Sequence, residues 1–275
     1  MSTFHAPDGT RLAHRTAGDG EPLICLPGGP TGSEYLGDLG GLAAHRRLIL
    51  LDPRGTGRSA RPGQVATYRC DRQVGDVEAL RAHLGLDRMD ILAHSGGANL
   101  AVRYAARHPR RVAKLALIGP GLRALGVPID GGTRRALALR RSGEPWFPAA
   151  FAALEAIIEG SGADWEAVAP FFCGRWDAGA RRHHAAGQPD NAEAVAGFAA
   201  EGAFDPAATR AALAAFASPA LLLAGEWDLN SPPSAVAAGA ELFPRAAFVV
   251  QSGAGHYPWI DDPRRFVATV AAFLG

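Results

Sequence analysis

Residues 90–100 read DILAHSGGANL, and this stretch decides the fold that the sequence predicts. An apolar run ends at Ser95, small residues flank the serine, and an alanine-rich helical sequence follows. This order is typical of a nucleophile elbow, a sharp strand-to-helix turn that lifts a serine hydroxyl above the edge of a sheet. Side chains larger than alanine would collide two positions either side of the serine, where the chain has Ala93 and Gly97. The turn leaves the Gly96 N–H at a helix start, where unpaired backbone donors can bind an oxyanion.

A serine before a helix is also a common N-cap, so the elbow depends on what the rest of the chain supplies. Apolar strands and helices alternate along that chain. We expect an N-terminal hairpin around residues 8–9, strands at 23–26, 48–51, 90–94, 112–118, 220–225 and 246–251, and helices at 70–84, 96–107, 233–242 and 263–274. Buried strands that alternate with helices predict an α/β fold, a mostly parallel sheet flanked by helices with ligands at the carboxyl ends of the strands.

The interval between the strands at 112–118 and 220–225 is too long for a simple crossover. It contains alanine-rich, helix-like stretches, so we expect residues 121–217 to form an inserted helical cap on a core domain of residues 1–120 and 218–275. Aromatic side chains of a cap can pack its own core or line an apolar pocket that faces the elbow. The predicted pocket residues are Trp146, Phe147, Phe172 and Trp176.

A serine hydroxyl is a poor nucleophile at its ordinary pKa and needs a base, an orienting acid and oxyanion donors. The candidate acid is Asp228, which follows an apolar strand in a loop, with its neighbour Glu226 as a competitor. The candidate base is His256, which a glycine-punctuated loop delivers after the last predicted strand. The chain order Ser95, Asp228, His256 is the order of one nucleophile-elbow fold and differs from the trypsin-like and subtilisin-like orders.

A further oxyanion donor is predicted in residues 26–30, LPGGP, because glycines let a backbone approach a substrate oxygen closely. The candidate oxyanion hole therefore consists of the N–H groups of Gly29 and Gly96. In this scheme His256 takes the Ser95 proton and later protonates the leaving group, while Asp228 fixes the imidazole tautomer.

Composition excludes several other classes of function. The 275 residues are 48% hydrophobic with a formal net charge of +1, and the arginines are scattered in pairs, which argues against nucleic-acid binding. No signal peptide and no long apolar run is present, so we expect no membrane association and a cytoplasmic location. Neither the three widely spaced cysteines nor the adjacent His183 and His184 have metal-site spacing, so we expect no metal and no other cofactor.

Five segments carry a resemblance to a known family. They are PGGP at 27–30, DPRGTGRS at 52–59, HSGG at 94–97, GEWD at 225–228 and GAGH at 253–256. Together they resemble the α/β-hydrolase superfamily along nearly the whole chain, and the first two look most like its proline iminopeptidase branch. The resemblance implies an α/β-hydrolase fold and structural roles for Asp52, Arg54 and Ser59 beside the active site. The chain departs from the family pattern at Pro27, where histidine is usual, and at Ala93, where glycine is usual.

The predicted function is a cofactor-free serine hydrolase that cleaves a small ester or amide through an acyl-enzyme on Ser95. An esterase, lactonase, thioesterase, haloperoxidase or carbon–carbon bond hydrolase would share the triad, and a non-catalytic receptor that binds a small ligand is a further alternative. Proline iminopeptidases recognise a substrate amine through cap acids, so two acids that converge near the pocket would favour a peptidase and none would favour an esterase. The available acids are Glu144, Glu155, Glu159, Glu166, Asp177, Glu193 and Glu201. The only partner expected is a small-molecule substrate.

Overall fold

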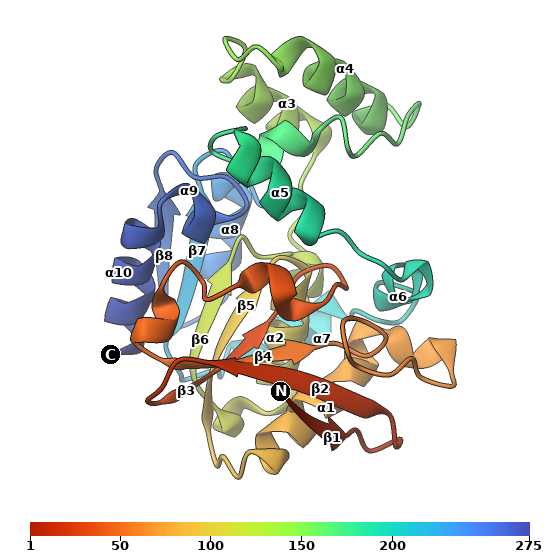
Figure 1. Ribbon diagram of the computed structural model, residues 1–275, viewed down its shortest axis with the longest axis vertical. Coiled ribbons are helices and arrows are strands. Elements are labelled where there is room, and N and C mark those ends of the chain that lie inside the picture. Colours follow the sequence, from red (N-terminus) through yellow and green to blue (C-terminus); the bar gives the residue numbers. More distant parts are fainter.

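An eight-stranded sheet forms the centre of the structure, a computed structural model that describes residues 1–275 (Figure 1). Its strands are β1 (Ser2–His5), β2 (Arg11–Ala17), β3 (Pro22–Leu26), β4 (Arg47–Asp52), β5 (Met89–His94), β6 (Val112–Ile118), β7 (Ala220–Gly225) and β8 (Ala246–Gln251). They lie in the order β1-β2-β4-β3-β5-β6-β7-β8. Strands β1 and β2 pair antiparallel, as does β2 with β4, and the remaining pairs are parallel. The mostly parallel sheet predicted from the alternating pattern is confirmed.

Alternate side chains of the central strands enter two different apolar cores. In β4, Ile49 and Leu51 belong to one core cluster, whereas Leu48 and Leu50 belong to the other. This alternation follows from the period of two along a strand, and it explains why the central strands are apolar throughout.

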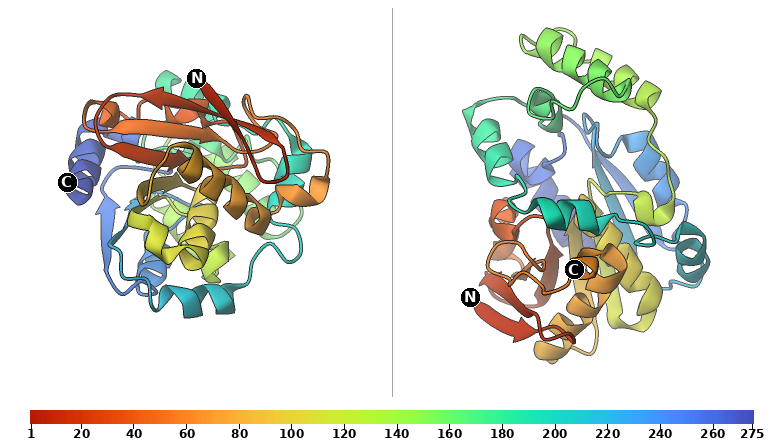
Figure 2. Two further views of the ribbon diagram at one scale, coloured as in Figure 1. Left: turned by 90° about the horizontal axis from the view of Figure 1, so that it is seen from below. Right: turned by 90° about the vertical axis from the view of Figure 1, so that its right-hand side faces the viewer.

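Helices cover both faces of the sheet (Figure 2). The first core holds side chains of α1 (Cys70–His83), α2 (Gly96–Arg107) and α8 (Pro233–Ala240), and the second holds those of α9 (Pro258–Asp261) and α10 (Pro263–Leu274). Short 3-10 turns connect other elements: η1 (Ser33–Leu36), η2 (Leu42–Ala44), η3 (Val65–Tyr68), η4 (Pro109–Arg111), η5 (Arg123–Leu125) and η6 (Ala169–Phe172). None of the helices combines the length and the apolar character that a bilayer crossing requires.

The long segment between β6 and β7, residues 119–219, carries five α-helices and is called the β6–β7 segment below. These are α3 (Gly131–Leu139), α4 (Phe147–Ile158), α5 (Ala178–Ala186), α6 (Ala192–Phe198) and α7 (Pro206–Leu213). Helices α3 and α4 lie farthest from the sheet, and α5 lies between them and the strands (Figure 1). The end of the segment returns to the first core, where Leu213 and Phe216 are fully buried. The expected domain limits at residues 120 and 217 stay a prediction.

Side-chain caps fix where several helices of this segment begin. Asp130, Asp177, Asn191 and Asp205 each accept a hydrogen bond from a backbone N–H in the first turn of α3, α5, α6 and α7. Such a cap stabilises a helix by about 1 kcal/mol, because it satisfies a donor that has no partner inside the helix.

Candidate active site

Ser95 stands at a strained turn between β5 and α2. Its backbone has φ 50° and ψ −122°, a combination that non-glycine residues rarely adopt and that costs about 1–3 kcal/mol. Hydrogen bonds to the neighbouring strand hold the turn in place: the Ser95 N–H donates to the Ile118 carbonyl at 3.0 Å, and the Gly121 N–H donates to the Ser95 carbonyl at 2.8 Å. The backbone geometry is therefore that of the elbow that the sequence pattern predicts.

Glycines let the elbow touch the loop that follows β3. A Cβ on Gly97 would lie 2.3 Å from the Pro27 carbonyl oxygen, and one on Gly96 would lie 2.5 Å from that of Gly29. Real Cβ atoms do not approach backbone oxygens so closely, so both positions require glycine at this separation. The elbow and the LPGGP loop thus meet backbone to backbone.

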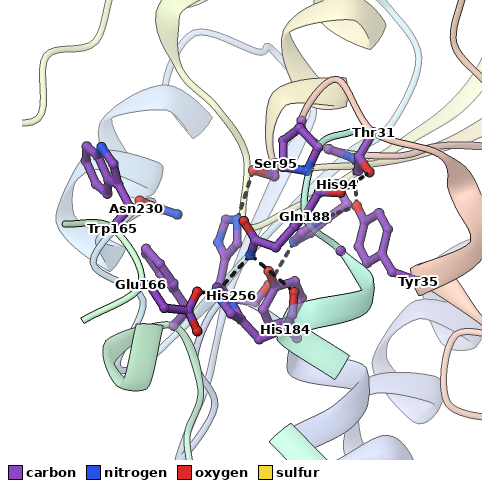
Figure 3. A pocket seen from close by; sticks show the side chains of 16 residues that line it. Thr31, Tyr35, His94, Ser95, Trp165, Glu166, His184, Gln188, Asn230 and His256 are labelled. Atoms are coloured by element: carbon purple, nitrogen blue, oxygen red, sulfur yellow. Dashed lines mark hydrogen bonds and ion pairs between the residues drawn. The ribbon is translucent and has the colours of Figure 1, made fainter. Parts of the chain in front are cut away.

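His256 and Asp228 lie in line with Ser95, as Figure 3 shows for the serine and the histidine. Nε2 of His256 is 2.8 Å from Oγ of Ser95, and Nδ1 is 2.7 Å from Oδ2 of Asp228. Asp228 is fully buried, and its other oxygen accepts hydrogen bonds from the N–H groups of Asn230 and Ser231 at 2.9 and 3.0 Å. Because an ionised carboxylate only accepts, Nδ1 carries a proton and Nε2 is free to accept the serine proton.

Glu226, the competing acid, makes other contacts. Its carboxylate accepts from the Gly253 N–H and the Ser252 hydroxyl, both at 2.9 Å, and pairs with Arg140 at 3.1 Å. These bonds, first of all the one from Gly253, lower its pKa. The structure thus brings Asp228, and not Glu226, to the histidine.

The two predicted oxyanion donors lie beside each other near Ser95. Gly29 has φ 98°, and its nitrogen is 3.2 Å from the place that a Cβ on Gly96 would occupy. The Gly29 N–H donates to no group of the protein, and Gly96 is the first residue of α2. Two neighbouring backbone N–H groups beside a serine are the kind of donors from which an oxyanion site is built.

A cavity of about 240 Å³ opens above Ser95 and His256 (Figure 3). Gly28 and Gly29 form part of its wall, and the β6–β7 segment supplies Trp165, Glu166, Phe172, His184 and Gln188. Asn230, two residues after Asp228, also lines the cavity. Asp52, Arg54 and Ser59 do not line this cavity. Asp52 instead accepts hydrogen bonds from Ser33 and Arg58.

Of the four aromatic residues expected in the pocket, Phe172 lines the cavity and the other three do not. Trp146 packs edge-on against Phe171, Phe147 stacks on Phe151, and Trp176 lies edge-on to His184. Trp146 directly precedes α4 and Phe147 is its first residue, and both pack against the apolar cluster that α3, α4 and η6 share. Trp165 lines the cavity instead and is 56% exposed at its rim.

Glu166 is the one carboxylate among the residues that line the cavity, and neither arginine nor lysine lines it. Its Oε2 is 3.7 Å from Nε2 of His184, whose pKa burial lowers. Other acids of the segment are engaged elsewhere: Glu155 pairs with Arg135 at 2.8 Å, and Asp177 caps α5. The sequence pattern could not single out Glu166 or His184, because the path of the β6–β7 segment decides which side chains reach Ser95.

The β6–β7 segment is tied to the loop that carries His256. The His256 N–H donates to the Phe172 carbonyl at 2.7 Å. The Asp261 carboxylate accepts from the Gly174 and Gly255 N–H groups at 2.9 and 2.7 Å, one from each side of this junction. Arg141, which is 5% exposed, donates to the carbonyls of Cys173 and Gly174 at 2.6 and 3.0 Å.

The amino-acid sequence is similar to those of several known proteins. The family model described as alpha/beta hydrolase fold matches residues 21–263. An N-formylmaleamate deformylase of Pseudomonas putida is 30% identical over 293 aligned positions, which cover 100% of this chain and 98% of the relative. A proline iminopeptidase of Heyndrickxia coagulans is 41% identical over 108 residues, but that match spans only 39% of this chain and 38% of the relative.

Solved structures give the same architecture. A thermophilic esterase from Thermogutta terrifontis superposes with a TM-score of 0.72 at 25% identity, covering 100% of this chain and 98% of the esterase. A proline iminopeptidase of Mycobacterium smegmatis superposes with a TM-score of 0.74 at 23% identity, covering 99% and 97%. At that identity the second likeness concerns the fold alone.

Proposed function

Because the chain belongs to the alpha/beta hydrolase fold family, we propose that it is a serine hydrolase that cleaves a small ester or amide through an acyl-enzyme on Ser95. The observation that carries the proposal is the pair of hydrogen bonds that joins Ser95, His256 and Asp228 in line. Together with the Gly29 and Gly96 N–H groups, these side chains provide a nucleophile, a base, an orienting acid and an oxyanion site.

The first half of the proposed reaction forms the acyl-enzyme. Ser95 Oγ attacks the substrate carbonyl carbon while His256 Nε2 takes the hydroxyl proton. The negative charge that develops on the carbonyl oxygen is stabilised by the two backbone donors, and a single such donor is typically worth about 3 kcal/mol in the transition state. The imidazolium, stabilised by Asp228, then gives its proton to the leaving alcohol or amine as the bond to the acyl carbon breaks.

The second half returns the enzyme to its starting state. A water molecule takes the place of the leaving group and loses a proton to His256 as it attacks the acyl carbon. The tetrahedral intermediate collapses, the bond to Ser95 breaks, and the serine recovers a proton from His256. The products are a carboxylic acid and the alcohol or amine released earlier, so no cofactor is required.

The size of the cavity favours a small substrate. In this proposal residues 121–217 serve as the lid over the cavity. A volume of about 240 Å³ lies slightly below the usual range of ligand pockets, so a compact acyl group and leaving group suit it. The lining is more polar than the aromatic pocket expected from the sequence, since it includes His184, Gln188 and Asn230. This favours a substrate that carries hydrogen-bonding groups close to its scissile bond.

A single observation keeps the aminopeptidase alternative open, namely the carboxylate of Glu166 at the cavity wall. One acid with no neighbouring cation would suit a substrate amine better than a substrate carboxylate. The relative named N-formylmaleamate deformylase, similar over the whole chain, directs attention instead to small amides. The substrates to compare are therefore p-nitrophenyl esters, aminoacyl p-nitroanilides and N-formylmaleamate.

The direct test is intact mass after treatment with a fluorophosphonate probe. We expect one phosphonyl adduct on Ser95 of the wild-type protein and none on the folded Ser95→Ala and His256→Ala variants. Circular dichroism of each variant controls for folding. A folded wild-type protein that takes up no probe would instead favour a non-catalytic protein that binds a small ligand in the same cavity.

A further inference from the structure

A buried series of hydrogen bonds runs from the loop after β3, through Tyr35 in η1 and His94 at the end of β5, to the loop that carries His256. The Gly28 N–H is 2.7 Å from Oη of Tyr35, which is 2.7 Å from Nδ1 of His94, and Nε2 of His94 is 2.9 Å from the His256 carbonyl oxygen. Tyr35 and His94 are 6% and 2% exposed. Figure 3 labels both side chains and marks the hydrogen bonds of the tyrosine hydroxyl among the residues drawn.

The two ends of this series of hydrogen bonds determine which atom donates and which accepts in each bond. A carbonyl oxygen only accepts, so Nε2 of His94 carries a hydrogen. Burial and the neighbouring His256 keep the pKa of His94 well below its ordinary value, so the ring is neutral and Nδ1 accepts. Tyr35 must therefore donate its hydroxyl hydrogen to His94, which leaves its oxygen free to accept from the Gly28 N–H. Oη of Tyr35 thus has two partners, and each ring nitrogen of His94 has one.

The upper end of the series holds the loop that carries a proposed oxyanion donor. A Cβ on Gly28 would lie 2.8 Å from Cβ of Ser95 and 3.2 Å from both Oη of Tyr35 and Nδ1 of His94. The backbone of Gly28 is thus fixed against the elbow on one side and by the tyrosine hydroxyl on the other. Gly29, whose N–H points to no protein acceptor, is the next residue.

The lower end of the series holds the residue proposed as the base. His94 contacts His256 both through the carbonyl and through the ring, since the two ring centroids are 4.6 Å apart. Trp259 packs edge-on against His94 at 4.8 Å and prevents the ring from turning away.

We propose that Tyr35 and His94 are positioning residues that set the placement of the Gly29 N–H relative to Ser95 and His256. This inference rests on the proposed hydrolase function. Both residues line the cavity wall, but they are almost fully buried and their polar atoms are bonded within the protein. Their effect should therefore appear in transition-state stabilisation and leave substrate binding nearly unchanged.

The first variant is Tyr35→Phe, which removes one hydroxyl and both of its hydrogen bonds. We expect kcat for the best p-nitrophenyl ester to fall about 10- to 100-fold, less than the loss of a whole oxyanion donor, with KM changed less than about threefold. A trifluoromethyl ketone that adds to Ser95 loads the oxyanion site, so its inhibition constant should rise by the same factor as kcat/KM falls.

The matched control is Tyr104→Phe. Tyr104 is fully buried in α2, and its hydroxyl donates to Oε2 of Glu78 at 2.7 Å, away from the cavity. We expect Tyr104→Phe to lower the melting temperature about as much as Tyr35→Phe does, and to leave kcat within about twofold of the wild-type value.

Two substitutions at His94 separate the ends of the series. In His94→Asn the amide oxygen can stand near the place of Nδ1 and accept from Tyr35, and in His94→Gln the amide nitrogen can stand near the place of Nε2 and donate to the His256 carbonyl. We expect each to keep more activity than His94→Ala. We also expect Tyr35→Phe to cost less on the His94→Gln background than on the wild type, because one of its bonds is already lost.

The outcomes are distinct for the two proposals. Absence of a phosphonyl adduct on folded wild-type protein would overturn the hydrolase function itself. Normal labelling of the wild type, with Tyr35→Phe as active and as tightly inhibited as Tyr104→Phe, would overturn the positioning role and leave Tyr35 and His94 as core residues. Equal activity of the three His94 variants would overturn it as well.

Discussion

The contacts of Asp228 show how a single side chain can select one tautomer of a histidine. Its Oδ1 is occupied by two backbone N–H groups, from Asn230 and Ser231, so only Oδ2 faces His256. The carboxylate therefore cannot rotate without losing two hydrogen bonds, each worth about 1 kcal/mol or more.

This arrangement predicts the effect of Asp228→Asn. The amide oxygen will replace Oδ1, because only an oxygen can accept from the two N–H groups, and the amide NH₂ will then face Nδ1 of His256. That ring nitrogen must accept, so the hydrogen moves to Nε2 and the proton from Ser95 has no acceptor. We expect kcat to fall about 10³- to 10⁴-fold in a folded protein. Esterase kinetics beside a denaturant titration checks this, and a loss below tenfold would contradict the assigned role.

The Glu166→Gln substitution distinguishes the two classes of substrate. A carboxylate at the cavity wall attracts a substrate amine but has no charge partner on a neutral ester. For an aminoacyl p-nitroanilide we expect kcat/KM to fall about tenfold or more, with p-nitrophenyl acetate within about twofold. Glu159→Gln, a change on an acid that does not line the cavity, is the control. Equal effects on both substrates would remove the peptidase alternative.

The residues that the sequence could indicate share one property, which is their place relative to a strand. Ser95, Asp228 and His256 each follow the end of a parallel strand, and parallel strands end at the same edge of a sheet. Trp165 and Glu166 follow no strand, and their approach to the cavity depends on how the β6–β7 segment folds back. The loop between α4 and α5 that carries them has no periodic pattern from which its path could be read.

Among the elements, the junction between the β3 loop and α2 depends on the absence of a side chain at Gly97. A Cβ there would lie 2.3 and 2.8 Å from the carbonyl oxygens of Pro27 and Leu26, so α2 would have to move away from the loop. We expect Gly97→Ala to lower the unfolding free energy by about 1–3 kcal/mol and the labelling rate of Ser95 by more than tenfold. Gly63→Ala is the control, since nothing lies within 4 Å of its would-be Cβ. A Gly97→Ala protein that labels at the wild-type rate would show that the contact can relax freely.

The elements differ in how far their limits could be predicted. Helix α2 was expected at 96–107 and is found at Gly96–Arg107, because the elbow fixes its start and His108-Pro109 follows its end. The limits of α3 and α4 could not be predicted, since their alanine-rich sequences give no sharp apolar stripe and they pack chiefly on each other and on η6. The short helix α9 was also not expected, and Trp259 within it is held by tertiary packing against His94 and Phe266.

For the whole molecule, a partly buried histidine that is neutral in the folded chain predicts a loss of stability in acid. Burial, and next His184, lower the pKa of His183 to about 4, whereas an unfolded histidine has a pKa of about 6.5. Between these values the unfolded chain binds a proton that the folded chain does not, so stability present above pH 6.5 is lost as the pH falls toward 4. We expect the advantage of the wild type over His183→Gln to shrink by about 1–2 kcal/mol between pH 7 and pH 5.

Urea titrations at the two pH values measure this difference. His45→Gln, a substitution at an exposed histidine, is measured beside it at both pH values as the comparison. A pH-independent difference for His183→Gln would mean that this side chain titrates alike in the folded and unfolded chains.

The hydrogen bond from the His256 N–H to the Phe172 carbonyl connects the backbone of the histidine directly to the wall of the cavity. Phe172 forms part of the cavity wall, and the Asp261 carboxylate holds the residues that follow it to the β8 loop through the N–H groups of Gly174 and Gly255. An outward displacement of Phe172 by a bulky molecule would pull on the backbone of His256 and would disturb its alignment with Ser95. Under the proposed mechanism, the acyl-enzyme is therefore expected to form only while the cavity wall keeps the position described here.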